Sequence, residues 1–237
     1  MVLITWNCQG AYRKKASVIL EFKPDILVVQ ECEHLEKLVY NADIPQPADF
    51  LWFGDNMHKG IGIFSYSHYK FQIDNLYNES FKFVVPIIVT GGQASFTMFA
   101  IWANNPQDTD GQYVEQVWKA INYYENIISN GPVILIGDFN SNTIWDKKKR
   151  IGNHSTLVAK LAEKRIVSVY HQYFGQSQGK EMHPTFFLYR NIEKPYHIDY
   201  CFVSNEFYQK LLKMEIGTHE NWKIYSDHIP LIFNFEM

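Results

Sequence analysis

The sequence predicts an α/β fold in which two packed β-sheets are flanked by helices. Three observations lead to this prediction. Runs of β-branched and aliphatic residues, typical of buried strands, recur along the chain. Amphipathic helical patterns lie between several of these runs. The runs 84–90 and 95–102 are joined by Gly91-Gly92, which is typical of an antiparallel hairpin. Strands, hairpins and helices mixed in this way favour two packed sheets.

The expected elements follow one another without a repeat, linker or low-complexity segment, so we expect residues 1–237 to form one domain. The runs predict strands near 2–7, 25–30, 61–65, 84–90, 95–102, 132–137, 197–203 and 229–235.

Helices are expected at about 12–22, 112–129 and 154–165. The first should end before Pro24, because the residue before proline resists helical geometry. The second has apolar residues at helical spacing and is followed by Asn130-Gly131-Pro132, which predicts a helix stop and a turn.

The composition is that of a protein with a substantial core: 237 residues, 46% hydrophobic and 16% aromatic. No run approaches the roughly 18 apolar residues of a membrane span, and the first residues read as a core strand rather than a signal peptide. The cysteines Cys8, Cys32 and Cys201 are odd in number and lack metal-site spacing. This pattern favours buried, reduced thiols and a cytoplasmic location.

The formal net charge of −3 argues against a protein that coats nucleic acid through a broad basic field. It does not exclude an enzyme that binds a few phosphates locally. The one dense basic run, Lys147-Lys148-Lys149-Arg150, is either a solvated loop or a phosphate-contacting loop beside a site.

The most informative motif is Gly137-Asp138-Phe139-Asn140, which follows the apolar run 132–136. A strand end that carries a carboxylate and, two residues later, an amide places both on the same side. Such a pair can orient a water molecule or a metal ion, although strand-Gly-Asp also occurs as a plain turn.

Further strand ends carry polar groups that a core strand does not need. Asn7 ends the first run and is followed by Gln9, and Glu31 ends the second. Asp199 lies inside the run 197–203, and Asp227-His228 opens the last one.

A carboxylate inside a core strand, such as Asp199, is costly unless it is paired. His228 offers a partner, since a carboxylate that accepts from one imidazole nitrogen fixes the ring and raises its basicity. The resulting imidazolium could bind a phosphoryl oxygen. The alternative is a pair that only ties two strands together.

A site at these strand ends would contain three carboxylates, from Glu31, Asp138 and Asp227, next to the amide of Asn7. Carboxylates that lie close together repel one another unless a cation lies between them. Glu31 can also be interpreted as a solvated residue that opens a helix. Oxygen-only ligands favour Mg²⁺ or Mn²⁺ over zinc. Metal, acid and cationic histidine together predict metal-assisted hydrolysis of a phosphate ester.

The chain resembles the endonuclease/exonuclease/phosphatase superfamily, in particular the apurinic-site endonucleases and pancreatic-type DNases, as a compact member of bacterial type. The resemblance runs in order over essentially the whole chain and is carried by six blocks: Thr5-Trp6-Asn7, Val29-Gln30-Glu31, Gly60-Ile61-Gly62-Ile63-Phe64-Ser65, Gly137-Asp138-Phe139-Asn140, His197-Ile198-Asp199-Tyr200 and Ser226-Asp227-His228. It implies a four-layer α/β/β/α sandwich with two packed mixed β-sheets and a site at one edge.

The resemblance also implies roles for the site residues. Glu31 would ligate the metal, with Asn7 and Asp227 close by as ligands or supports. Asp138 would orient and deprotonate the attacking water, and Asn140 would hold that water or a phosphate oxygen. His228, paired with Asp199, would stabilise the charge on the phosphoryl group in the transition state.

The sequence departs from the family pattern at three places. Gln9 stands where many nucleases have an acidic residue or Asn, which leaves a second metal contact open. The usual phosphate-contacting His or Tyr is missing from 99–104, where Asn104, or less readily Trp102, could substitute. His197 stands where Arg is common, and it could contact phosphate or be structural.

The expected activity is hydrolysis of phosphodiester bonds by a nuclease, endonuclease or exonuclease, with DNA as the expected substrate and RNA as the alternative. Phe186 and Phe187 lie where family nucleases place a base-pocket or abasic-pocket aromatic, so they are candidate substrate contacts, as are Asn104 and His197. The alternatives are a phosphatase or phosphodiesterase for a small phosphate ester, and a catalytically silent binding scaffold. Nucleic acid is the expected partner, with no membrane and no obligate protein partner.

Overall fold

Two six-stranded β-sheets stacked face to face form the centre of the protein, seen in a computed structural model that describes residues 1–104 and 112–237. The first sheet has the order β13-β14-β1-β2-β4-β3. Its strands are β1 Val2–Asn7, β2 Ile26–Cys32, β3 Asp49–Asn56, β4 Lys59–Ser65, β13 Leu211–Ile216 and β14 Leu231–Phe235.

The second sheet has the order β5-β6-β7-β8-β12-β9. Its strands are β5 Lys70–Ile73, β6 Val84–Thr90, β7 Phe96–Trp102, β8 Val133–Asp138, β9 Ile166–Ser168 and β12 Asp199–Ser204. Each sheet contains one parallel pair, β1 with β2 and β7 with β8, among antiparallel neighbours, so both sheets are mixed.

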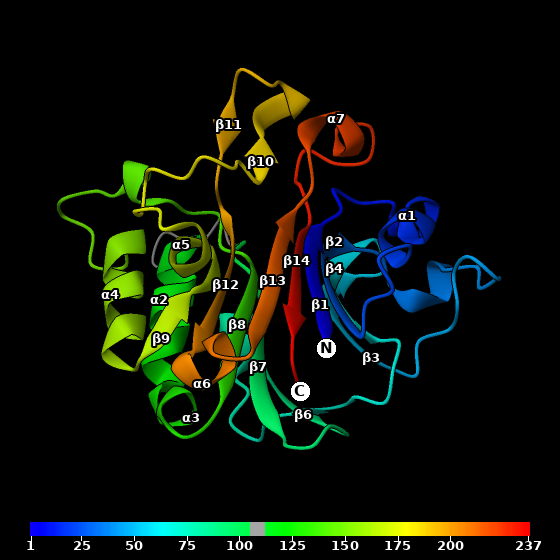
Figure 1. Ribbon diagram of the computed structural model, residues 1–237, viewed down its shortest axis with the longest axis horizontal. Helices are drawn as coiled ribbons and strands as arrows, with labels where there is room; N and C mark the ends of the chain where they lie inside the picture. Colours follow the sequence, from blue (N-terminus) through cyan, green and yellow to red (C-terminus); the bar gives the residue numbers. More distant parts are fainter. Residues whose placement is uncertain (105–111) are drawn as a thin grey trace.

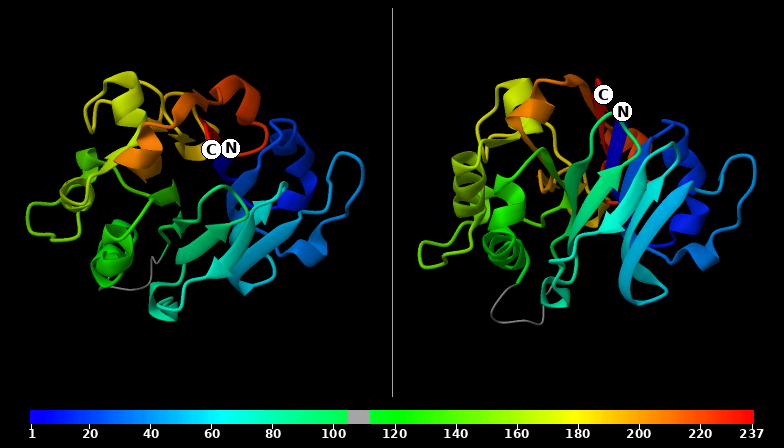
Figure 2. Two further views of the ribbon diagram at one scale, coloured as in Figure 1. Left: turned by 60° about the horizontal axis from the view of Figure 1, so that its bottom comes forward. Right: turned by 90° about the horizontal axis from the view of Figure 1, so that it is seen from below.

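Helices cover the outer faces of both sheets (Figure 1). Those described are α1 Ala16–Leu20, α2 Val114–Tyr123, α3 Glu125–Ser129, α4 His154–Glu163, α5 Val169–Phe174, α6 Asn205–Tyr208 and α7 His219–Trp222. Helices α2, α3 and α4 lie on the β8 side of the molecule and α1 lies on the β2 side, and the further views agree (Figure 2).

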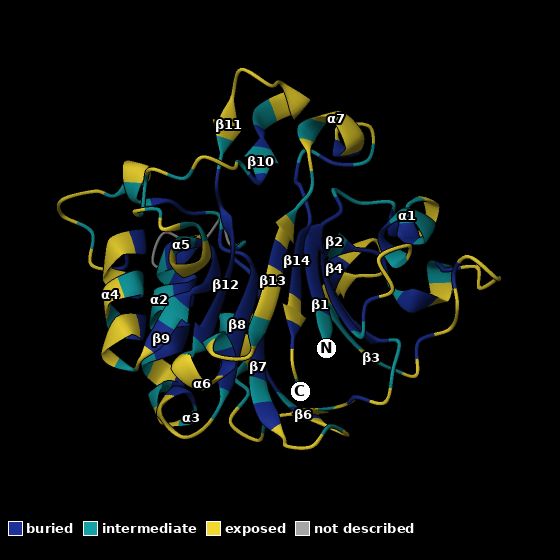
Figure 3. Ribbon diagram, in the orientation of Figure 1, coloured by how far each residue is buried: buried dark blue, intermediate teal, exposed yellow. Residues whose placement is uncertain are grey.

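Three apolar clusters separate these layers. One fills the space between the sheets, with Val28 of β2 and Ile136 of β8 among its members. A second joins the other face of the β8 sheet to α2 and α4, and a third joins the β1 sheet to α1 and α7. The central strands are accordingly buried, while exposed residues gather on the helices, on β13 and on residues 189–195 (Figure 3). The predicted four-layer α/β/β/α sandwich is confirmed.

All eight expected strands occur, and the hairpin predicted at Gly91-Gly92 is the antiparallel pair β6–β7. Among the strands of the two large sheets, β3, β5, β9 and β13 were not predicted from the sequence. Strands β3, β5 and β13 are largely solvent-exposed and β9 has only three residues, so none of them contains the long apolar run of a buried strand.

Two of the predicted helices differ in detail. The segment 12–22 forms a 3₁₀ turn, Tyr12–Lys14, followed by α1, which ends before Pro24 as expected. The segment 112–129 is divided into α2 and α3 at Tyr124, whose backbone leaves helical geometry. The Tyr124 side chain is fully buried, and its hydroxyl accepts a hydrogen bond from the Asn78 backbone at 2.9 Å, which fixes the break.

A short hairpin projects beyond the sheets at the edge where β1, β2 and β8 end (Figure 1). Its strands are β10 Phe186–Phe187 and β11 Pro195–Tyr196, and a 3₁₀ turn at Leu188–Arg190 lies between them. We call residues 186–196 the arm. Phe186 pairs with His228 across an isolated bridge, so the arm lies directly beside the candidate site.

No helix of the described ranges is long and apolar enough to cross a membrane. Cys8, Cys32 and Cys201 are free thiols and all are buried, in agreement with the expected packing.

Candidate active site

The two sheets are joined at their common edge by a hydrogen bond between Asn7 and Asp138. Asn7 ends β1 and Asp138 ends β8, and the Asn7 amide Nδ2 donates to Asp138 Oδ2 at 3.0 Å. Both side chains are buried. The Asn7 oxygen Oδ1 accepts from the backbone N–H of Gln9 at 3.0 Å, which fixes the orientation of the amide. Strand ends far apart in sequence therefore meet at one point.

Asp138 is held in a fixed orientation by Asn140. The backbone N–H of Asn140 donates to Asp138 Oδ1 at 2.8 Å, and its side-chain Nδ2 donates to Asp138 Oδ2 at 3.0 Å. The same Nδ2 also donates to the Ala103 carbonyl at 3.0 Å. Gly137 precedes Asp138 with φ +143°, and a Cβ there would collide with the Ile101 carbonyl. The motif thus uses glycine for close strand packing and Asn140 to orient the carboxylate.

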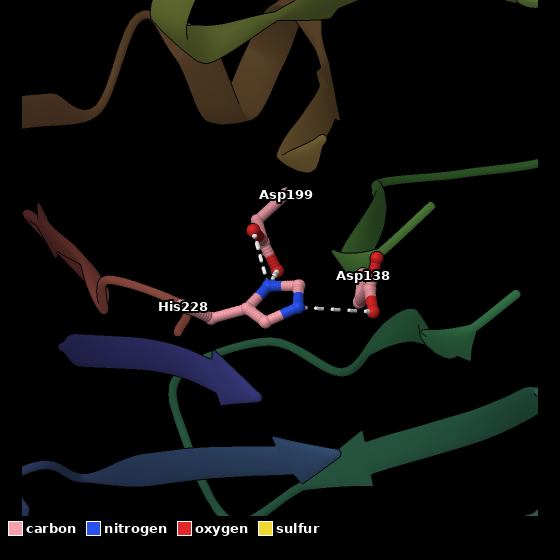
Figure 4. Close-up of side chains that lie close together, drawn as sticks. All are labelled: Asp138, Asp199 and His228. Atoms are coloured by element: carbon pink, nitrogen blue, oxygen red, sulfur yellow. Dashed lines mark hydrogen bonds and ion pairs between the residues drawn. The ribbon is translucent and has the colours of Figure 1, made fainter. Parts of the chain in front are cut away.

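The second carboxylate, Asp199, lies directly across the sheet from Asp138, because the two residues are register partners in the β8–β12 pair. His228 stands between them (Figure 4). Its Nδ1 donates to Asp199 Oδ2 at 2.9 Å, and its Nε2 lies 4.0 Å from Asp138 Oδ2. The backbone N–H of Asp199 donates to Thr185 Oγ1 at 3.0 Å, which anchors the strand end.

The electrostatics of this cluster separate the two carboxylates by role. Burial by itself would lower the pKa of His228, but the attraction of Asp199 and Asp138 outweighs it and raises the pKa to about 10. Burial, with Asp199 adding to it, raises the pKa of Asp138 to about 7 against the opposing effect of His228. His228 is therefore a buried cation at neutral pH, and Asp138 is a proton acceptor poised near neutrality.

Three residues in or just after the last part of a strand here have left-handed backbone geometry. Gln9, Glu31 and Asn140 have φ values of 53°, 57° and 46°. This region is uncommon for residues other than glycine, and such outliers cluster at functional sites. At Glu31 the register of β2 against β4 also shifts, which is a bulge that redirects the side chain.

Glu31 and Asp227 supply half-buried carboxylates for a cation. Burial, with the neighbouring charge of Glu31 contributing, raises the pKa of Asp227. The Lys59 ammonium already pairs with Glu31 Oε2 at 2.9 Å, so a positive charge stands at this carboxylate. Oxygen donors of this kind, including the Asn7 amide, fit a hard divalent cation. These oxygen donors are therefore chemically suited to Mg²⁺ or Mn²⁺.

Among the described residues, Asp138, Asp199 and His228 also form a buried group whose potential ligand atoms all lie within 4.8 Å of one another, so this group could hold a metal ion. The imidazole must be neutral to act as a ligand. Because the Asp199 pair holds His228 in its protonated form, the imidazole has no free lone pair for a metal ion in this state.

Two cations in the site were not identified from the sequence. Lys59 opens β4, and its ammonium also lies 5.5 Å from the centre of the Trp102 ring. Arg190, in the arm, donates from Nε to Gln9 Oε1 at 3.0 Å, and Gln9 Nε2 donates to Asp227 Oδ2 at 2.7 Å. Gln9, noted as a departure from the family pattern, therefore links the arm to Asp227. The only sequence signal was position: Lys59 directly precedes the block at Gly60, and Arg190 follows Phe186 by four residues.

The structure places the four candidate substrate contacts differently. The Phe186 ring lies 4.7 Å from the His228 ring, within the site. Phe187 is buried in the cluster beneath the β1 sheet, against His219. Asn104 directly follows Ala103, the carbonyl partner of Asn140, and is half-buried.

His197, the fourth, lies in a buried polar network rather than at the surface. Its Nδ1 donates to the His183 carbonyl at 2.7 Å, its ring packs 4.3 Å from Tyr170, and its Nε2 has no partner among the described residues. Burial lowers its pKa to about 4. His154, in the same network with Ser141 and Gln178, has its pKa lowered to about 4 by burial as well.

These neutral histidines predict a loss of stability in acid. Both pKa values, about 4, lie below the ordinary 6.5, so the unfolded chain binds more protons and stability falls as pH falls from 6.5 to 4. Each ring contributes on the order of 3 kcal/mol over this window. Urea unfolding across the window should show the slope. It should decrease in His154→Gln and in His197→Gln but not in His58→Gln, an exposed control, and an unchanged slope in both buried variants would refute the assignment.

A buried imidazolium facing a buried proton acceptor, beside oxygen donors for a cation, suits the hydrolysis of a phosphate ester. Together with the four-layer sandwich, this places the protein in the class of α/β/β/α phosphoester hydrolases. The profile of the endonuclease/exonuclease/phosphatase family matches residues 4–228, and the chain belongs to this family.

The chain is similar in fold to several solved structures, and each of the alignments below covers 100% of this chain and 100% of the other. An AP endonuclease from Archaeoglobus fulgidus has a TM-score of 0.70 at 16% identity. A 3′ phosphatase from Neisseria, bound to product DNA hairpin, has a TM-score of 0.65 at 18% identity, and a 3′-5′ exonuclease from Neisseria meningitidis has a TM-score of 0.63 at 18% identity. No curated protein matches the sequence.

Proposed function

We propose that this protein, acting as one domain, is a divalent-metal-dependent nuclease that hydrolyses phosphodiester bonds in DNA, with RNA as the alternative polynucleotide. The observation that carries the proposal is the His228 imidazolium held by Asp199 with its Nε2 4.0 Å from Asp138. It supports a site that removes a proton from water next to a fixed positive charge.

In this proposal Asp138 takes the proton from the attacking water. Hydrogen bonds from Asn7 and Asn140 fix the orientation of its two oxygens, so the carboxylate can accept a proton only from a defined direction. The Asn140 amide holds the water or a phosphate oxygen. His228 Nε2 donates to the phosphoryl oxygen on which charge develops, while Asp199 keeps the proton on Nδ1.

Glu31, Asn7 and Asp227 would hold Mg²⁺ or Mn²⁺. When bound, the ion polarises the phosphoryl oxygen and stabilises charge on the leaving group. Lys59 pairs with Glu31 at 2.9 Å and would have to release this carboxylate for it to hold the ion.

The proposed substrate class rests on the arm and on the similar structures. Two of those structures are a 3′ phosphatase with a DNA hairpin and an AP endonuclease. Phe186 beside His228, with Asn104 and Arg190 near the same edge, offers aromatic and polar contacts for a nucleotide. Phe187 and His197 are buried, so in this proposal they support the substrate side of the site from beneath.

The second candidate is a phosphatase or phosphodiesterase for a small phosphate ester. The net charge of −3 favours it, because such a substrate needs no extended basic surface. A silent scaffold is the least compatible reading: Asp138, Asp199 and His228 are all buried, and buried charges with no function are costly.

The deciding experiment compares cleavage of end-labelled abasic duplex, intact duplex, single-stranded DNA and RNA by purified protein with Mg²⁺ or Mn²⁺. Cleavage that is abolished by chelator and by Asp138→Asn supports a nuclease, and the preferred substrate names its subclass. Absence of cleavage, with hydrolysis of small phosphate esters instead, would establish the second candidate. Inactivity on both sets would leave the scaffold.

The metal assignment makes its own prediction. Glu31→Gln keeps the size of the side chain but removes its charge, so we expect Mg²⁺ affinity to fall at least about 10-fold, with activity partly restored at high Mg²⁺. Activity against Mg²⁺ concentration and Mn²⁺ binding by electron paramagnetic resonance measure it. Glu36→Gln, an exposed neighbour, is the matched control. Equal metal curves for Glu31→Gln and the wild type would rule out this ligand.

A further inference from the structure

A cavity opens beside the candidate active site. It encloses about 300 Å³ between the loop after β8 and the start of α2. Its lining includes Asn140, Trp145, Lys147, Arg150 and Tyr113. Asn140 belongs to both places, since its Nδ2 donates to Asp138 Oδ2. A group bound in the cavity would therefore be adjacent to the reacting atoms.

A row of aromatic rings connects the cavity to His228. The Trp145 ring lies 4.9 Å from Tyr196 on β11, Tyr196 lies 6.3 Å from Phe186 on β10, and Phe186 lies 4.7 Å from His228. Trp145 is 43% exposed, although a large indole normally buries more of its surface. The row thus places aromatic rings, on which flat groups could stack, between the cavity and His228.

The charges in the cavity favour an anion. The Lys147 ammonium has no hydrogen bond or ion pair within the described part of the chain. Arg150 is fixed by its bonds from Nη2 to Glu115 and to the Gln112 carbonyl, each within 2.9 Å, so its remaining N–H groups have a set direction.

The one carboxylate in the lining is already engaged. Asp146 accepts from the backbone N–H groups of His154 and Ser155 at the start of α4, at 2.9 and 3.0 Å. Its charge is therefore partly balanced by the helix. Since the Arg150 charge is paired with Glu115, Lys147 is the cation that attracts an anion, and Arg150 offers its remaining N–H groups.

The volume sets the size of the occupant. About 300 Å³ is at the lower end for small-molecule sites and is far too small for a duplex. A base that stacks on Trp145 must be outside a duplex stack, because in a duplex its faces are covered by neighbouring bases. The chemistry therefore indicates one flat, unpaired base carried on a phosphate backbone.

We propose that this cavity binds the unpaired nucleotide that flanks the scissile phosphate, with its base against Trp145 and its phosphate on Lys147 and Arg150. This rests on the proposed nuclease function and narrows its substrate to single-stranded or frayed nucleic acid. It also assigns a role to the basic run at 147–150, of which Lys147 and Arg150 line the cavity while Lys148 and Lys149 do not.

The test compares four substrates: a short single-stranded DNA, the RNA of the same sequence, the same DNA as a blunt duplex, and bis(p-nitrophenyl) phosphate, which has no flanking nucleotide. We expect the single strands to be preferred over the duplex. Trp145→Ala should lower kcat/KM on the preferred strand about 10-fold, mainly through KM, and Trp145→Phe should recover most of it. Lys147→Ala should also raise KM and reduce its salt dependence, whereas Lys148→Ala should match the wild type.

Binding separates this proposal from the catalytic one. In the Asp138→Asn background, fluorescence anisotropy of a labelled single strand should give a Kd that rises about 10-fold on adding Trp145→Ala. An unchanged Kd would overturn the cavity proposal even if the wild type cleaves nucleic acid. Cleavage of bis(p-nitrophenyl) phosphate alone, without Trp145-dependent binding of either strand, would also overturn it while leaving a phosphodiesterase. Trp145-dependent binding without hydrolysis of any diester would instead overturn the nuclease function.

Discussion

Replacing Asp138 with asparagine is expected to lower turnover at least about 10²-fold with little change in the fold. The asparagine side chain has the same shape but cannot accept a proton from water. Its amide oxygen can replace Oδ2 and accept from the Nδ2 groups of Asn7 and Asn140, but its NH2 group then replaces Oδ1 and faces the backbone N–H of Asn140. The loss should appear in kcat, since the carboxylate acts on the attacking water rather than on substrate binding.

The pH dependence sharpens this prediction. Burial raises the pKa of Asp138 to about 7, so wild-type kcat should rise with pH as this carboxyl loses its proton. That rising limb should be absent from Asp138→Asn. Asp55→Asn, a change at an exposed carboxylate that pairs with Lys82, is the matched control and should keep the wild-type profile. Near-normal kcat in Asp138→Asn would remove Asp138 from the role of base, and thermal unfolding would show whether the variant is folded.

The parts of the site that could be predicted from the sequence are those that depend on strand geometry. Asn7 and Asp138 each follow an apolar run and end a strand, and the ends of strands in stacked sheets meet at a common edge. Asp199 was expected inside an apolar run, but β12 begins at this residue, so its carboxylate also lies at the edge. Asp138 and Asn140 do meet, through two hydrogen bonds, but the predicted reason was wrong: β8 ends at Asp138 and Asn140 has φ +46°, so a turn rather than the side-chain period of a strand brings them together.

The parts that could not be predicted depend on backbone irregularity and on distant segments. Glu31 reaches its place through a bulge and a positive φ, which no propensity of glutamate indicates. Lys59 and Arg190 become site cations only because a hairpin and the arm bring them beside Glu31 and Gln9. Lysine and arginine on exposed segments have no periodic pattern that separates these two from the others.

The arm shows how this dependence on distant segments shapes the chemistry. Arg190 reaches Asp227 only through Gln9, so the position of the arm and the position of a proposed metal ligand are coupled by two hydrogen bonds. An acidic residue at position 9 would be paired directly by Arg190 and would compete with Asp227 for the cation. Gln9 is uncharged, so the negative charge stays on Asp227, and its hydrogen bonds to Arg190 and Asp227 hold the arm beside that carboxylate.

His228→Ala is expected to lower turnover by at least about 10²-fold, because it removes the positive charge that stabilises the transition state. It also leaves Asp199 and Asp138, which are register partners, facing each other without a cation. Their repulsion should raise the pKa of Asp138 further, so the rising limb of the rate profile should move to higher pH. A purely structural link would give the same shift, because the His228 charge acts on Asp138 in either case, but it would leave kcat near normal at high pH.

The same variant should be less stable but folded. Breaking a buried pair costs about 3–5 kcal/mol, which is within the stability of an ordinary domain. The pKa of His228, about 10 in the folded protein, exceeds the ordinary 6.5, so its stabilisation is complete below pH 6.5 and is lost as pH rises to 10. Urea unfolding over this range should show that slope in the wild type and in His58→Ala, the exposed control, but not in His228→Ala.

The double variant His228→Ala/Asp199→Ala separates the two roles. If Asp199 acts only through the imidazole, removing both should cost no more activity than removing His228 alone, and it should recover stability by relieving the uncompensated carboxylate. A His228→Ala protein that fails to fold, with a folded double variant of near-normal activity, would mean that the pair ties β12 to the segment before β14 and takes no part in the chemistry. A folded single variant whose kcat stays low on the high-pH plateau, where Asp138 is ionised, would establish the imidazolium as part of the reaction, because the displaced titration of Asp138 cannot explain a loss there.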